Sequence, residues 1–198
     1  MLAVRRYDRF EHVGAAVPDR LHQEDGCRAT ATPPGMKYEG QGGPALRDLA
    51  ELLRNYGDPA DVTRLLRRTT FNMAVGNADA HAKNFSILHE TDNAAISLAP
   101  LYDVLSTIAL ELKDSPGQPM QADTHLGQRV GGQADIRKVT AVSLIDEAVT
   151  WGIRRRTASA VIAETIDRVL AAIPETVGGD RVLATVRKQA EQLRRSQR

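Results

Sequence analysis

The sequence predicts a mainly helical fold with one short β-hairpin. Aromatic residues make up only 4% of the chain, so leucine, valine, isoleucine and alanine are expected to form the core, which favours helices over a β-sandwich. Apolar residues recur at helical spacing within 44–56 and 58–75. Two short apolar runs, at 85–88 and 95–98, flank a polar turn and predict the hairpin.

Length and composition are those of one ordinary globular domain over residues 1–198. The 26 Lys and Arg residues nearly balance the 25 Asp and Glu residues, which argues against binding nucleic acid through bulk charge. Clusters such as Arg64, Arg67 and Arg68 are expected to lie mostly on solvated helix faces. The single cysteine, Cys27, excludes an internal disulfide. Neither a signal peptide nor an apolar run of membrane-spanning length is recognised, so we expect a cytoplasmic protein without a membrane partner.

The N-terminal quarter is predicted to contain little regular structure. Residues 1–10 are expected to form a strand and its exit, and residues 11–43 a loop-rich segment with a short helix near 21–30. The glycine-rich turn at 39–44 is expected to deliver Pro44 to the first position of a helix.

Two amphipathic helices should follow. The first, at 44–56, has a leucine face and ends at Gly57. The second begins near Asp58 and Pro59 and runs to about Val75, with Gly76 as the residue that ends it.

The C-terminal half is predicted to be helical after a long loop. Residues 111–135 are rich in glycine, proline, glutamine and aspartate and are expected to form a mobile loop. Three helices are predicted to close the chain, at about 138–151, 157–172 and 179–196. The whole count is about six helices and one hairpin.

The chemistry of the sequence is concentrated in "GNADAHAKNFS", which lies between a helix and the hairpin. Four residues separate Asp79 from Asn84, and Asp103 comes just after the second hairpin strand. A hairpin returns the chain to its start, so Asp103 is expected to face Asn84. Mg²⁺ prefers a few protein oxygens with phosphates and water, and an aspartate can accept a hydroxyl proton. This spacing follows the logic of a kinase catalytic loop and its metal-binding aspartate.

The segment "GNADAHAKNFSILHE…ISLAPLYDVLST" closely resembles the HipA-type serine/threonine kinases, which are toxins of bacterial toxin–antitoxin pairs. The stretch "VRRYDR" at 4–9 is similar to the hinge of that family, and residues 20–44 resemble its stretch between the hinge and the first large helix. The resemblance covers roughly residues 4–107. It implies a fold like the C-terminal lobe of a protein kinase.

The resemblance also implies a reaction and its central residues. Asp79 would accept the proton of a serine or threonine hydroxyl on a protein substrate, and Asn84 and Asp103 would hold Mg²⁺. ATP would be the phosphate donor. The substrate implied is a translation-related cytosolic protein, and the implied partner is an antitoxin of the HipB type, through which any DNA contact would be indirect.

Further residues are implied to lie near the nucleotide. His81 and Lys83 would approach the ATP phosphates, and Tyr102 would lie beside the nucleotide. Backbone groups from Arg5 to Tyr7 would face the adenine.

The resemblance covers the second kinase lobe, and we expect the N-terminal lobe to be absent from the chain. A kinase needs a phosphate-covering loop and a strand lysine as well. None of the five lysines precedes the hinge-like residues 4–9. The N-lobe would then come from a separate chain or have been lost.

Two other functions remain open at this point. The chain could be an inactive fragment that binds an antitoxin or a separate N-lobe chain, or a metal-dependent hydrolase built on Asp79, His81 and Asp103. Asp79 and His81 could also form half of a transition-metal site, but the other histidines show no ligand spacing; these are His12, His22, His89 and His125.

Overall fold

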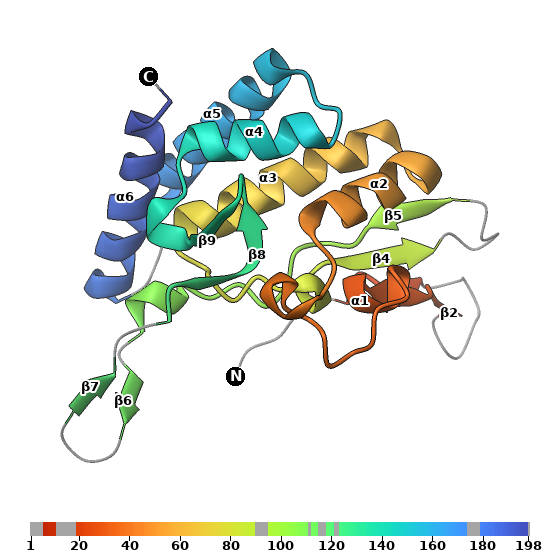
Figure 1. The fold of residues 1–198 in the computed structure, drawn as a ribbon, viewed down its shortest axis with the longest axis horizontal. Coiled ribbons are helices and arrows are strands. Elements are labelled where there is room, and N and C mark those ends of the chain that lie inside the picture. The colour runs from red at the N-terminus through yellow and green to blue at the C-terminus, as the bar shows by residue number, and fades with distance from the viewer. Residues whose placement is uncertain are drawn as a thin grey trace.

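The computed structural model describes most of the chain and confirms the mainly helical fold class. The described residues are 6–10, 19–89, 95–110, 112–114, 118–120, 123–173 and 179–197. Figure 1 shows the longer helices packed as one body, with a small sheet beside them. None of the helices within these ranges is both long enough and apolar enough to cross a membrane.

Both central helices are confirmed, with one correction at the first. Helix α2 (Leu46–Tyr56) begins two residues after the predicted Pro44, because Ala45 is the N-cap residue and its N–H donates to the Asp48 carboxylate at 2.8 Å. Helix α3 (Pro59–Val75) begins behind Asp58, whose side chain accepts from the Ala60 N–H at 2.6 Å.

The three predicted C-terminal helices are present. They pack around α3. They are α4 (Ala141–Thr150), α5 (Arg155–Ala172) and α6 (Asp180–Arg195). Helix α3 packs against both α5 and α6, so it forms the centre of the helical body (Figure 1). The core between them is aliphatic, and its fully buried side chains include Leu65, Leu66, Leu144, Ile162, Ile166 and Leu193.

The predicted hairpin is present within a sheet of three strands. Strands β4 (Ser86–His89) and β5 (Ile96–Leu98) pair antiparallel, and β3 (Gln23–Asp25) pairs with the other edge of β4. The helix expected near 21–30 is therefore wrong in most of its length. Pairing with β4 holds its first half extended, and only α1 (Gly26–Ala29) is helical.

Of the strand and exit predicted at 1–10, residues 1–5 lie outside the described residues. Strand β1 (Arg9–Phe10) pairs antiparallel with β2 (Asp19–Arg20). The described residues also form four short 3₁₀ helices: η1 (Glu39–Gln41), η2 (Ala82–Asn84), η3 (Thr107–Ala109) and η4 (Ile136–Lys138).

The mobile loop predicted at 111–135 is wrong, because this segment contains two hairpins. Strands β6 (Leu112–Asp114) and β7 (Gln118–Met120) pair in a ribbon that projects from the body (Figure 1). Strands β8 (His125–Val130) and β9 (Gln133–Asp135) pair around Gly131 and Gly132, both of which have positive φ. Two glycines in that conformation form the tight turn that a hairpin favours.

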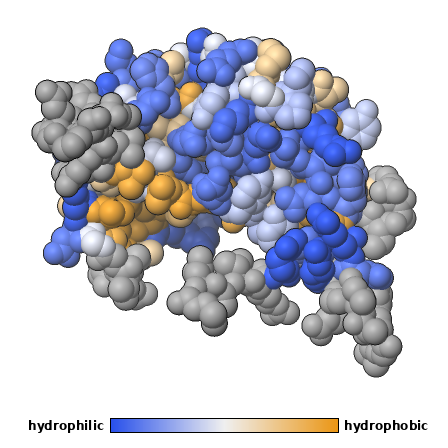
Figure 2. All heavy atoms as spheres, turned by 90° about the horizontal axis from the view of Figure 1, so that it is seen from below, coloured by the Kyte–Doolittle hydropathy of each residue, from blue (hydrophilic) through white to orange (hydrophobic). Residues whose placement is uncertain are grey.

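The surface of the molecule is largely polar. Figure 2 shows one face on which hydrophilic residues dominate, with a single hydrophobic area toward one side. Among the described residues, the large apolar side chains that are exposed include Val104 and Leu105, directly after Asp103.

Candidate functional site

The polar loop begins where α3 ends, at Gly76. This glycine has φ +76°, and a Cβ there would lie 2.6 Å from Cγ1 of Ile108, so both the backbone and the space require glycine. The Asn77 N–H then donates to the Asn72 carbonyl at 2.8 Å, and the Asn77 side-chain amide donates to Asn72 Oδ1 at 3.1 Å. The direction in which the loop leaves the helix is thus fixed.

Three distant segments hold the same loop in place. The Ala78 N–H donates to Thr107 Oγ1 at 2.8 Å, and the Ala78 carbonyl accepts from the Gly127 N–H at 2.8 Å. Gly127 lies so close that a Cβ would come within 2.8 Å of the His81 backbone nitrogen. On the other side, the Ala82 N–H donates to the Lys37 carbonyl at 3.1 Å. Such support from several elements pre-organises the loop.

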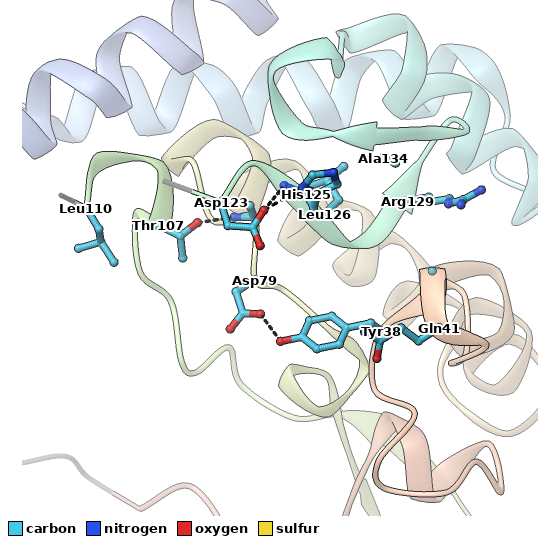
Figure 3. Close-up of a pocket in the computed structure, with 12 residues that line it drawn as sticks. Tyr38, Gln41, Asp79, Thr107, Leu110, Asp123, His125, Leu126, Arg129 and Ala134 are labelled. Carbon is cyan, nitrogen blue, oxygen red and sulfur yellow. Dashed lines mark hydrogen bonds and ion pairs between the residues drawn. The ribbon is translucent and has the colours of Figure 1, made fainter. Parts of the chain in front are cut away.

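Asp79 is exposed and lines a hollow of about 560 Å³ between η1, η3 and β8 (Figure 3). The Tyr38 hydroxyl donates to Asp79 Oδ1 at 3.0 Å, and Figure 3 shows the two side chains pointing toward one another. The tyrosine therefore holds one carboxylate oxygen, and the other is available to a group that enters the hollow.

His81 lies buried beneath the loop as a neutral imidazole. Lys37 Nζ is 2.8 Å from His81 Nε2, and because an ammonium group only donates, Nε2 accepts and Nδ1 carries the proton. Burial lowers the pKa of His81, Lys37 lowers it further, and the carboxylates of Asp79 and Asp103 oppose this shift. Both aspartates therefore act on the same ring. Within the described part of the chain, Nδ1 has no hydrogen-bond partner.

Asn84 and Asp103 offer oxygen atoms that a metal ion could bind. Asn84 Nδ2 donates to the Asp79 carbonyl over a long 3.3 Å, which leaves the amide oxygen Oδ1 to point elsewhere. Asp103 has φ +53° and an exposed carboxylate. A non-glycine residue in this left-handed region is often found at functional sites. A carboxylate and an amide oxygen of this kind fit Mg²⁺, which keeps water and phosphate as its other ligands.

Arg68 anchors the chain segment that carries Asp103. Its guanidinium donates to the carbonyls of Leu98, at 3.2 Å, and Ala99. Burial lowers the pKa of Arg68 to about 10, so the group remains charged near neutral pH. This arginine was expected on a solvated face, and the structure instead places it against the end of β5.

A second hollow, of about 460 Å³, contains Tyr7, Lys83 and Tyr102. The Tyr102 hydroxyl donates to the Lys83 carbonyl at 2.5 Å and lies 2.6 Å from Ser86 Oγ. Burial raises the pKa of Tyr102, which keeps this hydroxyl protonated as a donor. The other lining residues are Arg6, Asp8, Arg20, Gln23, Asp25 and Ser86.

The structure thus separates the candidate residues into two groups. Asn84 donates to the Asp79 carbonyl and the carboxylates of Asp79 and Asp103 act on His81, whereas Lys83 lines the second hollow with Tyr7 and Tyr102. The prediction places Arg5 near the nucleotide as well, and this residue lies outside the described residues. The catalytic, metal-binding and nucleotide-binding roles of all these residues stay predictions.

Sequence reasoning missed Lys37, Tyr38 and Thr107 as parts of this site. Tyr38 and Asp79 are separated by 41 positions, and Thr107 lies 29 positions from Ala78. Nothing in the local sequence "GMKYEG" marks Lys37 or Tyr38 as a neighbour of the polar loop. Only the tertiary fold brings them together.

Asp8 gives the hinge-like segment a testable pH dependence. Its buried carboxylate accepts from Arg6 at 2.7 and 2.6 Å and from Arg9 at 2.5 Å. The hydrogen bond from Arg6 lowers the pKa of Asp8 to about 2, against the opposing effect of burial. A depressed pKa in the folded state means that this stabilisation is present above about pH 4 and is lost as the pH falls toward 2.

We therefore expect Asp8→Asn to be less stable than the wild type at pH 6 and to lose less stability between about pH 4 and pH 2. Urea unfolding at a series of pH values measures both curves. Asp146→Asn, at an exposed carboxylate on α4, is the matched control. Parallel curves for Asp8→Asn and the wild type would contradict the assignment.

Comparison with known proteins identifies the family. The family model described as the HipA-like C-terminal domain matches residues 1–173. Two curated proteins of Sinorhizobium fredii (strain NBRC 101917 / NGR234) are similar to this chain. Putative kinase Y4mE is 52% identical over 110 residues, which cover 54% of this chain and 26% of that protein. Putative kinase Y4dM is 36% identical over 107 residues, which cover 54% of this chain and 24% of that protein.

A solved structure supports the same fold. The chain superposes with a TM-score of 0.75 on a chain in the complex of HipA, HipB and operator DNA from the toxin–antitoxin system of Shewanella oneidensis MR-1. The sequence identity is 22%, and the match covers 97% of this chain and 46% of the other. The matched regions are thus about a quarter of the curated relatives and about half of the solved chain. The fold is that of the C-terminal lobe of a HipA-type kinase, and the chain belongs to the HipA-like C-terminal domain family.

Proposed function

We propose that this chain forms the catalytic lobe of a HipA-type serine/threonine protein kinase that transfers the γ-phosphate of ATP to a protein hydroxyl. The observation that carries the proposal is that Asn84 donates to the Asp79 carbonyl while the carboxylates of Asp79 and Asp103 both act on the buried His81 ring. A carboxylate base beside a carboxylate–amide pair is the minimum that a kinase loop needs on this side of the cleft.

Asp79 is the proposed proton acceptor. The Tyr38 hydroxyl holds Oδ1, which directs the second carboxylate oxygen toward an acceptor hydroxyl in the hollow. This hollow is therefore the proposed place of the substrate serine or threonine. Positioning of the hydroxyl and removal of its proton are the tasks that such a residue performs in phosphoryl transfer.

Asn84 and Asp103 are the proposed metal-binding residues. Asn84 would contribute Oδ1 and Asp103 its exposed carboxylate. A bound Mg²⁺ would neutralise negative charge that develops on the phosphates. His81 is proposed to approach the phosphates as a neutral ring, without adding a second cation beside Lys37.

The second hollow is the proposed nucleotide pocket. Tyr7 and Tyr102 line it and supply aromatic surface, and the Lys83 side chain supplies a cation for the phosphates. Backbone groups from Arg5 to Tyr7 are proposed to face the adenine. The Tyr102 hydroxyl is proposed only to hold the pocket in position, because it already donates to the Lys83 carbonyl and contacts Ser86 Oγ.

The proposed assembly includes partners. A protein kinase also uses a phosphate-covering lobe, and the proposed activity requires one. The solved HipA neighbour belongs to a complex with HipB and operator DNA, which supports an antitoxin of the HipB type as a partner and an indirect DNA contact. A translation-related cytosolic protein is the proposed substrate.

Calorimetric titration of the chain with ATP tests the proposal. We expect saturable ATP binding in the presence of Mg²⁺. The affinity should fall by more than about tenfold in EDTA, because the oxygens of Asn84 and Asp103 can bind phosphate only through a metal ion. Equal binding with and without Mg²⁺ would contradict it. The absence of heat at nucleotide concentrations above about 1 mM, the upper range of typical KM values, would also contradict it. Turnover of a simple phosphoester without ATP would favour a hydrolase instead.

A further inference from the structure

Three metal-ligating side chains meet at the edge of the sheet where β3 pairs with β4. His22 directly precedes β3, Glu24 lies within it and His89 ends β4. Gln23 is opposite Leu88 in the register, and the His89 N–H donates to the His22 carbonyl at 2.9 Å. Backbone pairing therefore fixes the spacing of all three residues.

The side-chain atoms are already close to the geometry of a metal site. His89 Nε2 is 3.1 Å from Glu24 Oε2, and His22 Nε2 is 3.6 Å from Glu24 Oε1. One ligand atom from each of the three residues can be chosen so that all lie within 4.8 Å of one another. Ligand bonds of 2.0–2.1 Å in a tetrahedral zinc site place neighbouring ligand atoms about 3.3 Å apart. Only small side-chain rotations separate the cluster from that arrangement.

The ligand set selects a class of ion. Two imidazoles and one carboxylate suit Zn²⁺ and its neighbours in the first transition row, whereas Mg²⁺ and Ca²⁺ prefer oxygen ligands only. Burial raises the pKa of Glu24, but the hydrogen bonds and charges of His89 and His22 together outweigh burial, so the pKa lies below its ordinary value. The carboxylate is therefore in its ligating form near neutral pH.

Burial within the cluster is uneven. The side chains of His89 and Glu24 are 23% and 21% exposed, whereas His22 is 55% exposed. An ion would enter from the His22 side, and water would complete its coordination there. The rings of His22 and His89 are 4.9 Å apart at an angle of 48°, so the two imidazoles are not stacked face to face.

We propose that His22, Glu24 and His89 bind one transition-metal ion of the Zn²⁺ class, which ties the segment before α1 to the strand that follows the catalytic loop. The site is distinct from the proposed Mg²⁺ site in residues and in ligand chemistry. Ser86 and His89 stand at opposite ends of β4, so the ion would stabilise the sheet rather than contact the nucleotide pocket.

Arg28 competes with the proposed ion. Its Nε donates to Glu24 Oε1 at 3.1 Å, the same oxygen that lies near His22. Because Arg28 is itself exposed and lies only four residues along the chain, the ion can displace it without disturbing the core. Removal of this arginine should therefore leave binding intact or tighten it.

Calorimetry with Zn²⁺, and visible absorption with Co²⁺ as the spectroscopic probe, test the proposal on the wild-type chain. We expect one ion per chain and a rise in the unfolding temperature on addition of Zn²⁺. Single substitutions His22→Ala, Glu24→Gln and His89→Ala should each weaken binding by about 100-fold or more. Loss of groups that only hydrogen-bond to metal ligands and orient them already costs about 10–100-fold. His125→Ala, at an exposed histidine outside the cluster, is the matched control and should bind as the wild type.

Circular dichroism in the absence of metal shows whether each variant folds. His22 is the decisive position, because its exposed side chain can be removed with the least effect on folding. Wild-type affinity in a folded His22→Ala chain would overturn the proposal, and so would weaker binding in Arg28→Ala or a loss of binding in His125→Ala. The absence of stoichiometric Zn²⁺ binding would leave the cluster as polar contacts between Glu24 and the two histidines, and would overturn the proposal as well.

Discussion

Asp79→Asn is expected to lower the rate of phosphate transfer by about 10²- to 10⁴-fold, the usual contribution of a general base, while the affinity for ATP·Mg²⁺ is unchanged. Asparagine keeps the shape of the side chain and the oxygen that accepts from the Tyr38 hydroxyl. It cannot accept a proton from the substrate. The change therefore removes one chemical step and leaves the hollow and the loop as they are.

The measurement combines initial rates and calorimetry. Transfer of labelled γ-phosphate to a general protein acceptor is followed in the assembled kinase, the chain together with the lobe that covers the phosphates. Tyr38→Phe is the matched comparison, because it removes only the hydroxyl that orients Asp79 and should have a smaller effect on the rate. A wild-type rate in Asp79→Asn would place the base elsewhere. A parallel loss of nucleotide affinity would make Asp79 a binding residue.

The sequence was sufficient for the helices and for the first hairpin because their signals are local. Helix α3 has apolar residues at helical spacing and is bounded by Asp58 and Gly76. In the sequence, the apolar runs of β4 and β5 are separated by an Asp–Asn pair, which predicts a turn. Residues 111–135 differ, because their glycines and prolines predict a loop. Gly131 and Gly132 in fact form a hairpin turn, and Leu126 and Val130 of β8 are buried in the core.

The candidate site divides in the same way. The loop residues Asp79 and Asn84 are neighbours in sequence, and the hairpin that brings Asp103 back is itself a local motif. The contacts of Lys37 with His81 and of Tyr38 with Asp79 cross more than 40 positions, and no spacing rule predicts them. The cluster around Glu24 was missed for the same reason, because β3 was not recognised as a partner of β4.

Asp103→Asn is expected to weaken Mg²⁺-dependent ATP binding by about 100-fold or more, a larger loss than that caused by removal of second-shell partners of a metal. Asp103 is the charged member of the proposed pair, and Asn84 is neutral, so the substitution leaves Mg²⁺ without a carboxylate from this pair. Stability should not fall. Asparagine tolerates the left-handed region well, and φ at this position is +53°. Affinity and stability therefore separate a metal ligand from a structural residue.

Titration of ATP at fixed Mg²⁺, together with thermal unfolding of the ligand-free chain, measures both quantities. Asp146→Asn removes an exposed carboxylate on α4 that pairs with Arg155 at 2.6 Å, and it should change neither ATP binding nor its dependence on Mg²⁺. Mg²⁺-dependent binding of wild-type strength in Asp103→Asn would exclude this carboxylate as a ligand. A lower unfolding temperature with unchanged affinity would instead assign Asp103 to the turn after β5, where Arg68 already holds the backbone of Leu98 and Ala99.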